Sequence, residues 1–246
     1  MRADDSAFTE GRGCYTSTRI VGGRPRFPDR HAARIERSAR QLGLGEVDPA
    51  VVERALTELG QAAFGDGDGI VRLQASRDGD GALHLIGVPR AIGHEPATWR
   101  AIVVALPHAG AGLAAGIKVS SRLSMALAGD AAREAGVDEA LLLDGAGCLV
   151  EGSRSNLIVV PHAGGPITPP AAAGGVSGIA RGLALERVAE LTEAKITEAE
   201  LRGADEIVAV NAVRGACPII ELDAAPVGSG QPGPWATTLA DALASD

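Results

Sequence analysis

Residues 109–136 read AGAGLAAGIKVSSRLSMALAGDAAREAG, a Gly/Ala-rich loop that runs directly into a segment patterned as a helix. The loop ends at Lys118, and the only other lysine among the 23 basic residues of the chain is Lys195. Lysine can form a Schiff base with an aldehyde, whereas arginine cannot. The chain therefore offers two side chains for that chemistry. Taken alone, Lys118 is equally consistent with an ordinary solvated loop lysine.

The sequence before the loop alternates strand and helix patterns, with turn residues between them. Glycine-rich turns join neighbouring strands, and Asp or Pro precedes each helix. The expected elements are, in order, two short strands within 14–27, a helix over 29–44 capped by Asp29, a helix over 49–64 that Asp48 and Pro49 begin, and strands over 70–76, 82–92 and 99–107.

The sequence after the loop predicts a second set of mixed elements. They are a helix after Lys118, strands over 138–144, 148–153, 156–160 and 166–168, a helix starting within 175–181, a short strand over 195–197, a helix over 198–204, strands over 205–213 and 218–227, and a helical tail from Trp235. We therefore expect an α/β (α+β) protein of two lobes. The smaller lobe spans 1–106, an interdomain loop spans 107–117, and the larger lobe spans 118–246 and carries Lys118.

Composition excludes several classes of function. A net charge of −8 without a basic stripe argues against binding to nucleic acid or to an anionic membrane. No apolar run approaches the roughly 18 residues of a membrane helix, and the polar start of the chain does not read as a signal peptide. Three cysteines without a CxxC pattern predict reduced thiols and a cytoplasmic location. The GDGDG and RDGDG turns lack the spacing of a calcium loop, so no metal site is expected.

Four further features carry candidate chemistry, and each has a plain structural alternative. Glu151, where a strand turns, could pair with a protonated ring nitrogen or be a solvated turn acid. Arg34 could clamp a phosphate or lie on a helix surface. Residues 177–181 begin a helix whose free N–H groups favour an anion, although Ser177 could simply cap that helix. Residues 211–215 could supply a second set of N–H groups or form a simple turn.

In their order and spacing these segments resemble the class IV aminotransferase family, the pyridoxal-phosphate enzymes of fold type IV. The family includes D-amino-acid and branched-chain aminotransferases and aminodeoxychorismate lyase. The resemblance covers nearly the whole chain, through GRGCYTSTRI, GGRP, HAARIERSARQLG, GIKVSSRLSMALA, DEALLLDGAGCLVEGSRSNLIVV, ITPP, GVSGIAR and ADEIVAVNAVRGACPI. It implies a two-lobed fold like that of D-amino-acid aminotransferase, pyridoxal 5'-phosphate as cofactor, a small-molecule substrate and a homodimer.

The resemblance also implies roles for individual residues. Lys118 matches the lysine that binds the cofactor covalently and later moves protons. Glu151 matches the acid that keeps the pyridine nitrogen protonated, which makes the ring an electron sink. The remaining matches are the phosphate-binding arginine (Arg34), the two backbone phosphate turns (Ile179 and Ala180, Asn211 and Ala212) and an aromatic residue facing the substrate (Tyr15).

Three departures from the aminotransferases are similar to the lyases. GCYTS has no acid after Tyr15, GIKVSSRL places Arg122 after the lysine, and GIAR has Ala180 where many members have threonine. The branched-chain Glu-Glu-x-G-x-x-N segment is absent, because Val150 precedes Glu151, and a branched-chain aminotransferase is therefore not expected. The leading hypothesis is therefore aminodeoxychorismate lyase, which converts 4-amino-4-deoxychorismate to p-aminobenzoate and pyruvate in folate biosynthesis.

The substrate of that lyase carries two carboxylates, which arginine side chains could bind. The candidates are Arg214 and Arg90 first, then Arg122 and Arg154. One alternative function is a D-amino-acid or related class IV aminotransferase. A further alternative is a non-catalytic homologue, for which the short N-terminus, Ala180 and Arg12 (where the family has the aspartate of GDG) are the arguments.

Overall fold

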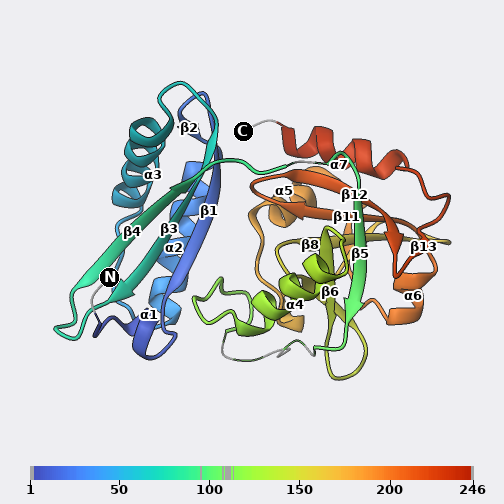
Figure 1. Ribbon diagram of the computed structural model, residues 1–246, viewed down its shortest axis with the longest axis horizontal. Helices are drawn as coiled ribbons and strands as arrows, with labels where there is room; N and C mark the ends of the chain where they lie inside the picture. Colours follow the sequence, from blue (N-terminus) through green and yellow to red (C-terminus); the bar gives the residue numbers. More distant parts are fainter. Residues whose placement is uncertain (1–2, 95, 107, 109–111, 113, 245–246) are drawn as a thin grey trace. The chain divides into compact units, whose positions relative to one another are not determined.

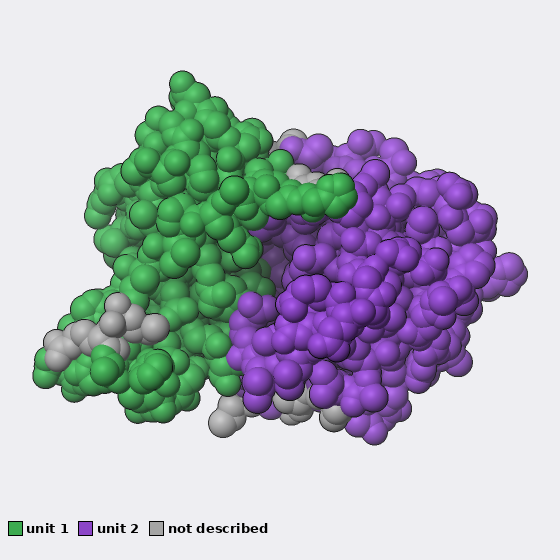
Figure 2. Space-filling model, in the orientation of Figure 1, with its two compact units in different colours: residues 1–95, 117–121, 246 green, residues 96–116, 122–245 purple. Residues whose placement is uncertain are grey.

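The computed structural model describes residues 3–94, 96–106, 108, 112 and 114–244, and its contacts divide the chain into two compact units (Figures 1 and 2). Unit 1 comprises Met1–Glu95 and Ile117–Ser121, and unit 2 comprises Pro96–Gly116 and Arg122–Ser245. This division differs from the expected one. Of the expected interdomain loop, residues 107, 109–111 and 113 lie outside the described residues. The contacts place Lys118 in unit 1, because its backbone pairs with the first strand of that unit.

Unit 1 is a four-stranded antiparallel sheet covered on one face by two helices (Figure 1). The sheet order is β2-β1-β3-β4, and its buried face packs with the helices around residues such as Ile35, Leu56 and Leu73. The elements are α1 (Ser6–Thr9), β1 (Cys14–Val21), β2 (Arg24–Pro25), α2 (Pro28–Gln41), α3 (Pro49–Phe64), β3 (Gly69–Arg77) and β4 (Leu83–Arg90). The sequence predicts all of these except α1, which is a single turn.

The two helices of unit 1 begin in different ways. Helix α3 begins as predicted, with Pro49 in its first turn and the Asp48 side chain accepting a hydrogen bond from Ala50 N at 2.9 Å. The predicted cap of α2 is wrong. That helix starts one residue before Asp29, after Phe27 in a left-handed conformation with φ 50°. Asp29 lies in the first turn instead, where its negative charge interacts favourably with the helix dipole.

Unit 2 is built on a nine-stranded mixed sheet in the order β10-β9-β8-β11-β12-β5-β6-β7, with β13 paired to β12. Helix α4 packs on β5 and β6, while α5 and α7 pack on each other and on β11. The elements are β5 (Trp99–Val104), α4 (Leu123–Glu134), β6 (Glu139–Leu143), β7 (Leu149–Gly152), β8 (Asn156–Pro161), β9 (Ile167–Thr168), α5 (Ile179–Arg187), β10 (Thr192–Glu193), α6 (Glu198–Arg202), β11 (Ala204–Asn211), β12 (Gly215–Leu222), β13 (Ala225–Pro226) and α7 (Pro234–Ala244).

One expected strand of unit 2 is misplaced. The short strand expected over 195–197 occurs at Thr192–Glu193, where it pairs with β9 in parallel. The chain after it is used differently, since Ile196 O accepts a hydrogen bond from Leu149 N and Thr197 caps α6 in a capping box with Glu200. In this segment capping overrides the strand pattern.

Gly23 provides a sharp test of packing in unit 1. A methyl group at this position would clash with the carbonyl oxygen of Gly65, and its φ is +75°. Gly43 has a similar φ of +65°, but no described atom lies within 4 Å of a methyl group placed there. We expect Gly23→Ala to lower the free energy of unfolding by about 1–3 kcal/mol more than Gly43→Ala, measured by urea denaturation. Equal decreases in the free energy of unfolding would mean that the backbone around Gly65 moves away from the added methyl group without an energetic penalty.

Candidate functional site

Lys118 is held by backbone pairing to the start of β1. Tyr15 N donates to Lys118 O at 2.9 Å, and Ser120 N donates to Gly13 O at 2.8 Å. This short antiparallel pairing fixes where the lysine side chain starts. Its Nζ lies 5.0 Å from the centroid of the Tyr15 ring, within the range of a cation–π contact.

Arg72 of β3 is a second cation on the same aromatic ring. Its Cζ lies 3.7 Å from the Tyr15 ring centroid, and its guanidinium donates to Gln74 Oε1 at 3.4 Å. Because strand residues alternate between faces, the pairing places Tyr15, Arg72 and Gln74 on the sheet face away from α2 and α3. The sequence analysis missed Arg72, although strand alternation from Tyr15 could have found it.

The register places two more arginines on this face. Arg19 of β1 lies opposite Ile70 of β3, which lies opposite Arg90 of β4. Opposite residues on neighbouring strands point to the same side of a sheet. We call Tyr15, Arg19, Arg72, Gln74 and Arg90 the cationic sheet face. It combines Arg90, a sequence-predicted candidate, with Tyr15.

His31 and Arg34 lie one turn apart on α2 and are both buried. His31 Nδ1 forms a hydrogen bond with Thr16 Oγ1, while His31 Nε2 has no hydrogen-bond partner among the described residues. Burial, with the positive charges of Arg34 and Lys118, lowers the pKa of His31 well below its usual value. Burial and the charge of Arg37 lower the pKa of Arg34 to about 10, so Arg34 stays cationic at neutral pH. Arg34 therefore stays a candidate phosphate ligand, and His31 beside it is a buried residue to which the sequence analysis gave no role.

In unit 2 the Glu151 side chain is buried and is reached by three donors. Its Oε2 accepts from Val176 N at 2.9 Å and from Asn156 Nδ2 at 3.5 Å, and its Oε1 lies 3.2 Å from His108 Nε2. The side chain is only 6% exposed. Glu151 is therefore a fixed acceptor, and the interpretation as a solvated turn acid is wrong.

Glu139 organises the turn that follows Glu151. Its carboxyl oxygens accept from Ser153 Oγ at 2.5 Å, Ser153 N at 3.0 Å, Ser155 Oγ at 2.6 Å and Ala140 N at 3.0 Å. Burial raises the pKa of Glu139, and the serine hydrogen bonds oppose that shift. The buried acid thus ties both serines of the turn to β6. The sequence analysis gave Glu139 no role.

The start of α5 offers backbone donors to an anion. Its N-cap is Gly178, which provides no side-chain cap, so the first N–H groups, including those of Ile179 and Ala180, lack intrahelical partners. Ser177, considered as a possible cap, does not occupy the cap position. The other predicted turn is more closed, because Asn211 Oδ1 accepts from Val213 N at 3.0 Å and from Arg214 N at 2.8 Å. The Asn211 side chain does not accept a hydrogen bond from Ala212 N, so Ala212 N is the candidate donor in that turn.

Three of the arginines proposed for the substrate have structural contacts in unit 2. Arg214 Cζ lies 5.5 Å from the Trp99 ring centroid, and its guanidinium donates to Pro96 O at 3.2 Å. Arg154 Cζ lies 4.9 Å from the same ring. Arg122 donates to Ser153 O at 3.3 Å, beside the turn after Glu151. Only Arg90 of the predicted set belongs to the cationic sheet face.

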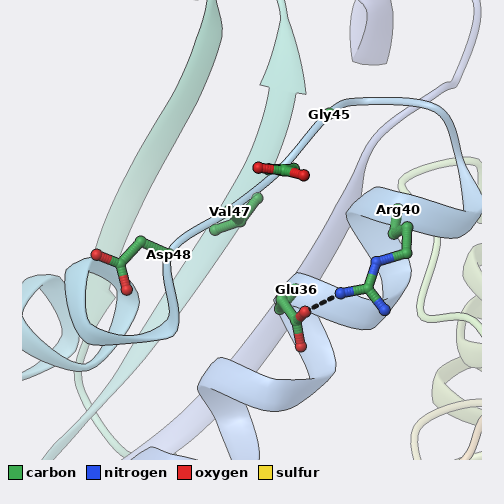
Figure 3. A pocket seen from close by; sticks show the side chains of 6 residues that line it. Glu36, Arg40, Gly45, Val47 and Asp48 are labelled. Atoms are coloured by element: carbon green, nitrogen blue, oxygen red, sulfur yellow. Dashed lines mark hydrogen bonds and ion pairs between the residues drawn. The ribbon is translucent and has the colours of Figure 1, made fainter.

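Figure 3 shows a hollow on unit 1 that is unrelated to these groups. It is lined by Glu36, Arg40, Gly45, Glu46, Val47 and Asp48, and an ion pair joins Glu36 to Arg40. None of the candidate residues lines it, and the Asp48 side chain in its wall already caps α3. We assign this hollow no chemistry.

The buried histidine makes stability depend on pH. Below about pH 6.5 an unfolded histidine takes up a proton, whereas folded His31 resists protonation, so the unfolded state binds more protons. Unfolding free energy should therefore fall as pH falls below 6.5, by at most about 1.4 kcal/mol per pH unit from this group. His31→Gln should flatten the slope in urea denaturation, whereas His162→Gln, at a side chain 88% exposed, should not. An unchanged slope in His31→Gln would contradict this assignment.

Comparisons with known proteins identify the family and the fold. The family model for class IV amino-transferases matches residues 13–222. The crystal structure of 4-amino-4-deoxychorismate lyase from Pseudomonas aeruginosa is 28% identical, with a TM-score of 0.87 over 99% of this chain and 94% of that chain. A branched-chain aminotransferase from Thermoproteus uzoniensis, solved with norvaline, is 25% identical, with a TM-score of 0.87 over 99% of this chain and 88% of that one.

A curated sequence matches over a shorter stretch. The probable branched-chain-amino-acid aminotransferase of Aquifex aeolicus is 34% identical over 117 residues, which is 46% of this chain and 37% of that protein. The match thus spans well under half of the relative. The matching curated relatives are branched-chain-amino-acid aminotransferases although this chain lacks the Glu-Glu-x-G-x-x-N segment, so the lack of that segment does not exclude such an activity. The family model nevertheless covers most of the chain, and the fold is the predicted fold type IV: the protein belongs to the class IV aminotransferase family, whose enzymes depend on pyridoxal phosphate.

Proposed function

We propose that this protein is a pyridoxal-phosphate enzyme that converts 4-amino-4-deoxychorismate to p-aminobenzoate and pyruvate. The observation that carries the proposal is the cationic sheet face beside Lys118. There an amine able to act as a base and a guanidinium able to bind a carboxylate lie over one tyrosine ring. Arg72 could bind one of the two carboxylates of that substrate there, and Arg19 and Arg90 lie on the same face about 13 Å farther along the strands.

The described residues fit the cofactor that the family uses. Its phosphate requires cationic and N–H donors. Unit 1 offers Arg34 as a cation, and unit 2 offers the N–H groups at the start of α5. Its ring nitrogen requires a fixed acid, which Glu151 provides. His31 Nε2 is buried and lacks a described partner, so this region of unit 1 can accept a further polar group.

Lys118 is the residue proposed to attach the cofactor and then to act as the base. When bound, pyridoxal phosphate supplies an electron sink that the side chains of the protein lack. Lys118 Nζ would remove the proton from the substrate carbon that bears the amino group. Loss of the enolpyruvyl group then forms an aromatic ring, so the protein mainly has to orient that C–H bond and hold the base.

The residue next to Tyr15 supports elimination over amino transfer. Where aminotransferases of the family tend to have an acid, this chain has Thr16, whose hydroxyl is engaged by His31 on the helix side of the sheet. The similarity to the Pseudomonas lyase extends over nearly the whole of both chains, which adds support.

A class IV aminotransferase is the second candidate, and a specific observation favours it. The matching curated relatives are branched-chain-amino-acid aminotransferases, each 34% or 35% identical over about half of this chain or less. On this alternative Lys118 and Glu151 keep the same roles. The difference is that an amino donor would leave its nitrogen on the cofactor and a keto acid would take it up.

Two broader expectations belong to the same proposal. The family resemblance supports a homodimer, and the absence of a CxxC pattern supports a reducing, cytoplasmic location. In the structure Cys14, Cys148 and Cys217 are free thiols. No helix within the described residues is long and apolar enough to cross a membrane.

Lys118 can be tested against the one other lysine. We expect the purified protein, supplied with pyridoxal phosphate, to release p-aminobenzoate from 4-amino-4-deoxychorismate. Lys118→Ala should lower that rate by at least about 10³-fold, because it removes both the attachment point and the base, whereas Lys195→Ala should retain it. Borohydride reduction followed by peptide mass spectrometry should place the cofactor on Lys118.

The outcomes of this assay separate the candidate functions. Cofactor bound at Lys118 without p-aminobenzoate, but with amino groups exchanged between branched-chain amino acids and keto acids, would replace the lyase with the aminotransferase. Cofactor absent from Lys118 would contradict both and favour a non-catalytic homologue.

Arg72 is the residue we expect to bind a substrate carboxylate. Arg72→Gln should raise KM by about 10- to 100-fold with a smaller effect on kcat, since it removes a charge-assisted hydrogen bond worth about 1.5–3 kcal/mol. Arg90→Gln tests the predicted rival on the same face, and Arg54→Gln, on the exposed side of α3, is the control. A larger KM effect from Arg90→Gln would transfer the role to Arg90.

A further inference from the structure

His108 has a defined position although the segment around it reads as a linker in the sequence. Its backbone N donates to Leu143 O at 2.8 Å, at the end of β6. Its side chain is 8% exposed, and Nε2 lies 3.2 Å from Glu151 Oε1. Leu142 and Glu151 are register partners on β6 and β7, so His108 attaches to both strands of one hairpin.

The number of hydrogen bonds that the Glu151 carboxylate can accept determines the effect of its contact with His108. A carboxylate has about four acceptor positions on its two oxygens. The described donors Val176 and Asn156 use Oε2, and His108 uses one position on Oε1. The donors among the described residues therefore leave one acceptor position, and it lies on the oxygen that accepts from His108.

The donors to Glu151 Oε2 are fixed in position, so a further donor could reach the carboxylate only at Oε1. Val176 N is a backbone donor, and Asn156 is fixed in turn because its Nδ2 also donates to Val176 O at 3.0 Å. A methyl group on Gly175 would lie 3.2 Å from Val150 O and 3.5 Å from Glu151 Oε2, so the backbone passes close to the acid there. His108 is the only side chain described at Oε1.

We propose that His108 is a positioning residue that orients Glu151 for a protonated ring nitrogen. It donates Nε2–H to Oε1, fixes the plane of the carboxylate and leaves its last acceptor position pointing in one direction. The inference rests on the proposed use of pyridoxal phosphate, and it assigns to His108 a role that acts only through Glu151.

A double-mutant cycle on cofactor affinity tests this role without an activity assay. Pyridoxal phosphate is titrated into cofactor-free protein and binding is followed by absorbance, for the wild type, His108→Leu, Glu151→Gln and the double variant. We expect His108→Leu to raise the Kd about tenfold, the effect of one hydrogen bond to a charged group. In the Glu151→Gln background the same change should alter the Kd less than about twofold.

Two further variants separate positioning from folding. His108→Gln keeps an N–H donor and should bind within about threefold of the wild type. His162→Leu removes a histidine from an exposed pair with Asp205 and should have no effect. If His108→Leu does not fold, as judged by circular dichroism, His108→Asn replaces it, because its side chain is too short to reach Oε1.

The outcomes are distinct. An unchanged Kd in His108→Leu, or an equal loss with and without Glu151, would overturn the positioning role while leaving the proposed function intact. Wild-type protein that takes up no pyridoxal phosphate would overturn the proposed function and this inference with it.

Discussion

The backbone pairing between the start of β1 and the segment after Gly116 is the constraint on which the candidate chemistry depends. Tyr15 N donates to Lys118 O, and Ser120 N donates to Gly13 O, so the lysine is carried by the sheet of unit 1. On the other side of Ile117, Gly116 N donates to Gly175 O and Gly116 O accepts from Ser177 N. Gly116 is thus hydrogen-bonded within unit 2, whereas Lys118 is hydrogen-bonded within unit 1. The pairing with β1 limits the freedom of the lysine backbone.

Some of the candidate residues carry charges that are buried, and burial of a charge is costly. Arg34, Glu139 and Glu151 are all nearly inaccessible to solvent. A buried ion is tolerated where hydrogen bonds compensate for lost hydration, and the two acids are compensated by backbone and side-chain donors. Arg34 retains its charge in spite of burial, since a guanidinium whose pKa is lowered to about 10 is still protonated near neutral pH. A binding function is one physical reason to keep such groups in a core that could otherwise be aliphatic.

Much of the fold could be predicted because its elements carry local signals. Asp48 and Pro49 mark the start of α3, and the strands of unit 1 alternate as a half-buried sheet should. The failures have both local and long-range causes, since the capping box of Thr197 and Glu200 is local and the pairing of Lys118 with β1 is long-range. The local pattern predicts Asp29 as the cap of α2. The helix instead begins one residue earlier, and Phe27, in a left-handed conformation, takes the N-cap position. Lys118 was assigned to the second lobe by its position in the chain, whereas pairing with β1 determines its unit.

The candidate site shows the same division. Lys118, Glu151 and Arg34 could be named as candidates from the resemblance to the family. Arg72 could be reached only through the strand register from Tyr15, and His108 carries no sequence signal, because it is identified by its contact with Glu151. Membership of the family fixes the cofactor and leaves the reaction open, since related sites on one fold support elimination and amino transfer alike. What can discriminate is the set of side chains around the shared lysine. On the cationic sheet face Arg72 shares the Tyr15 ring with Lys118. A branched aliphatic side chain would gain little from that guanidinium, whereas a substrate carboxylate would be bound and oriented by it.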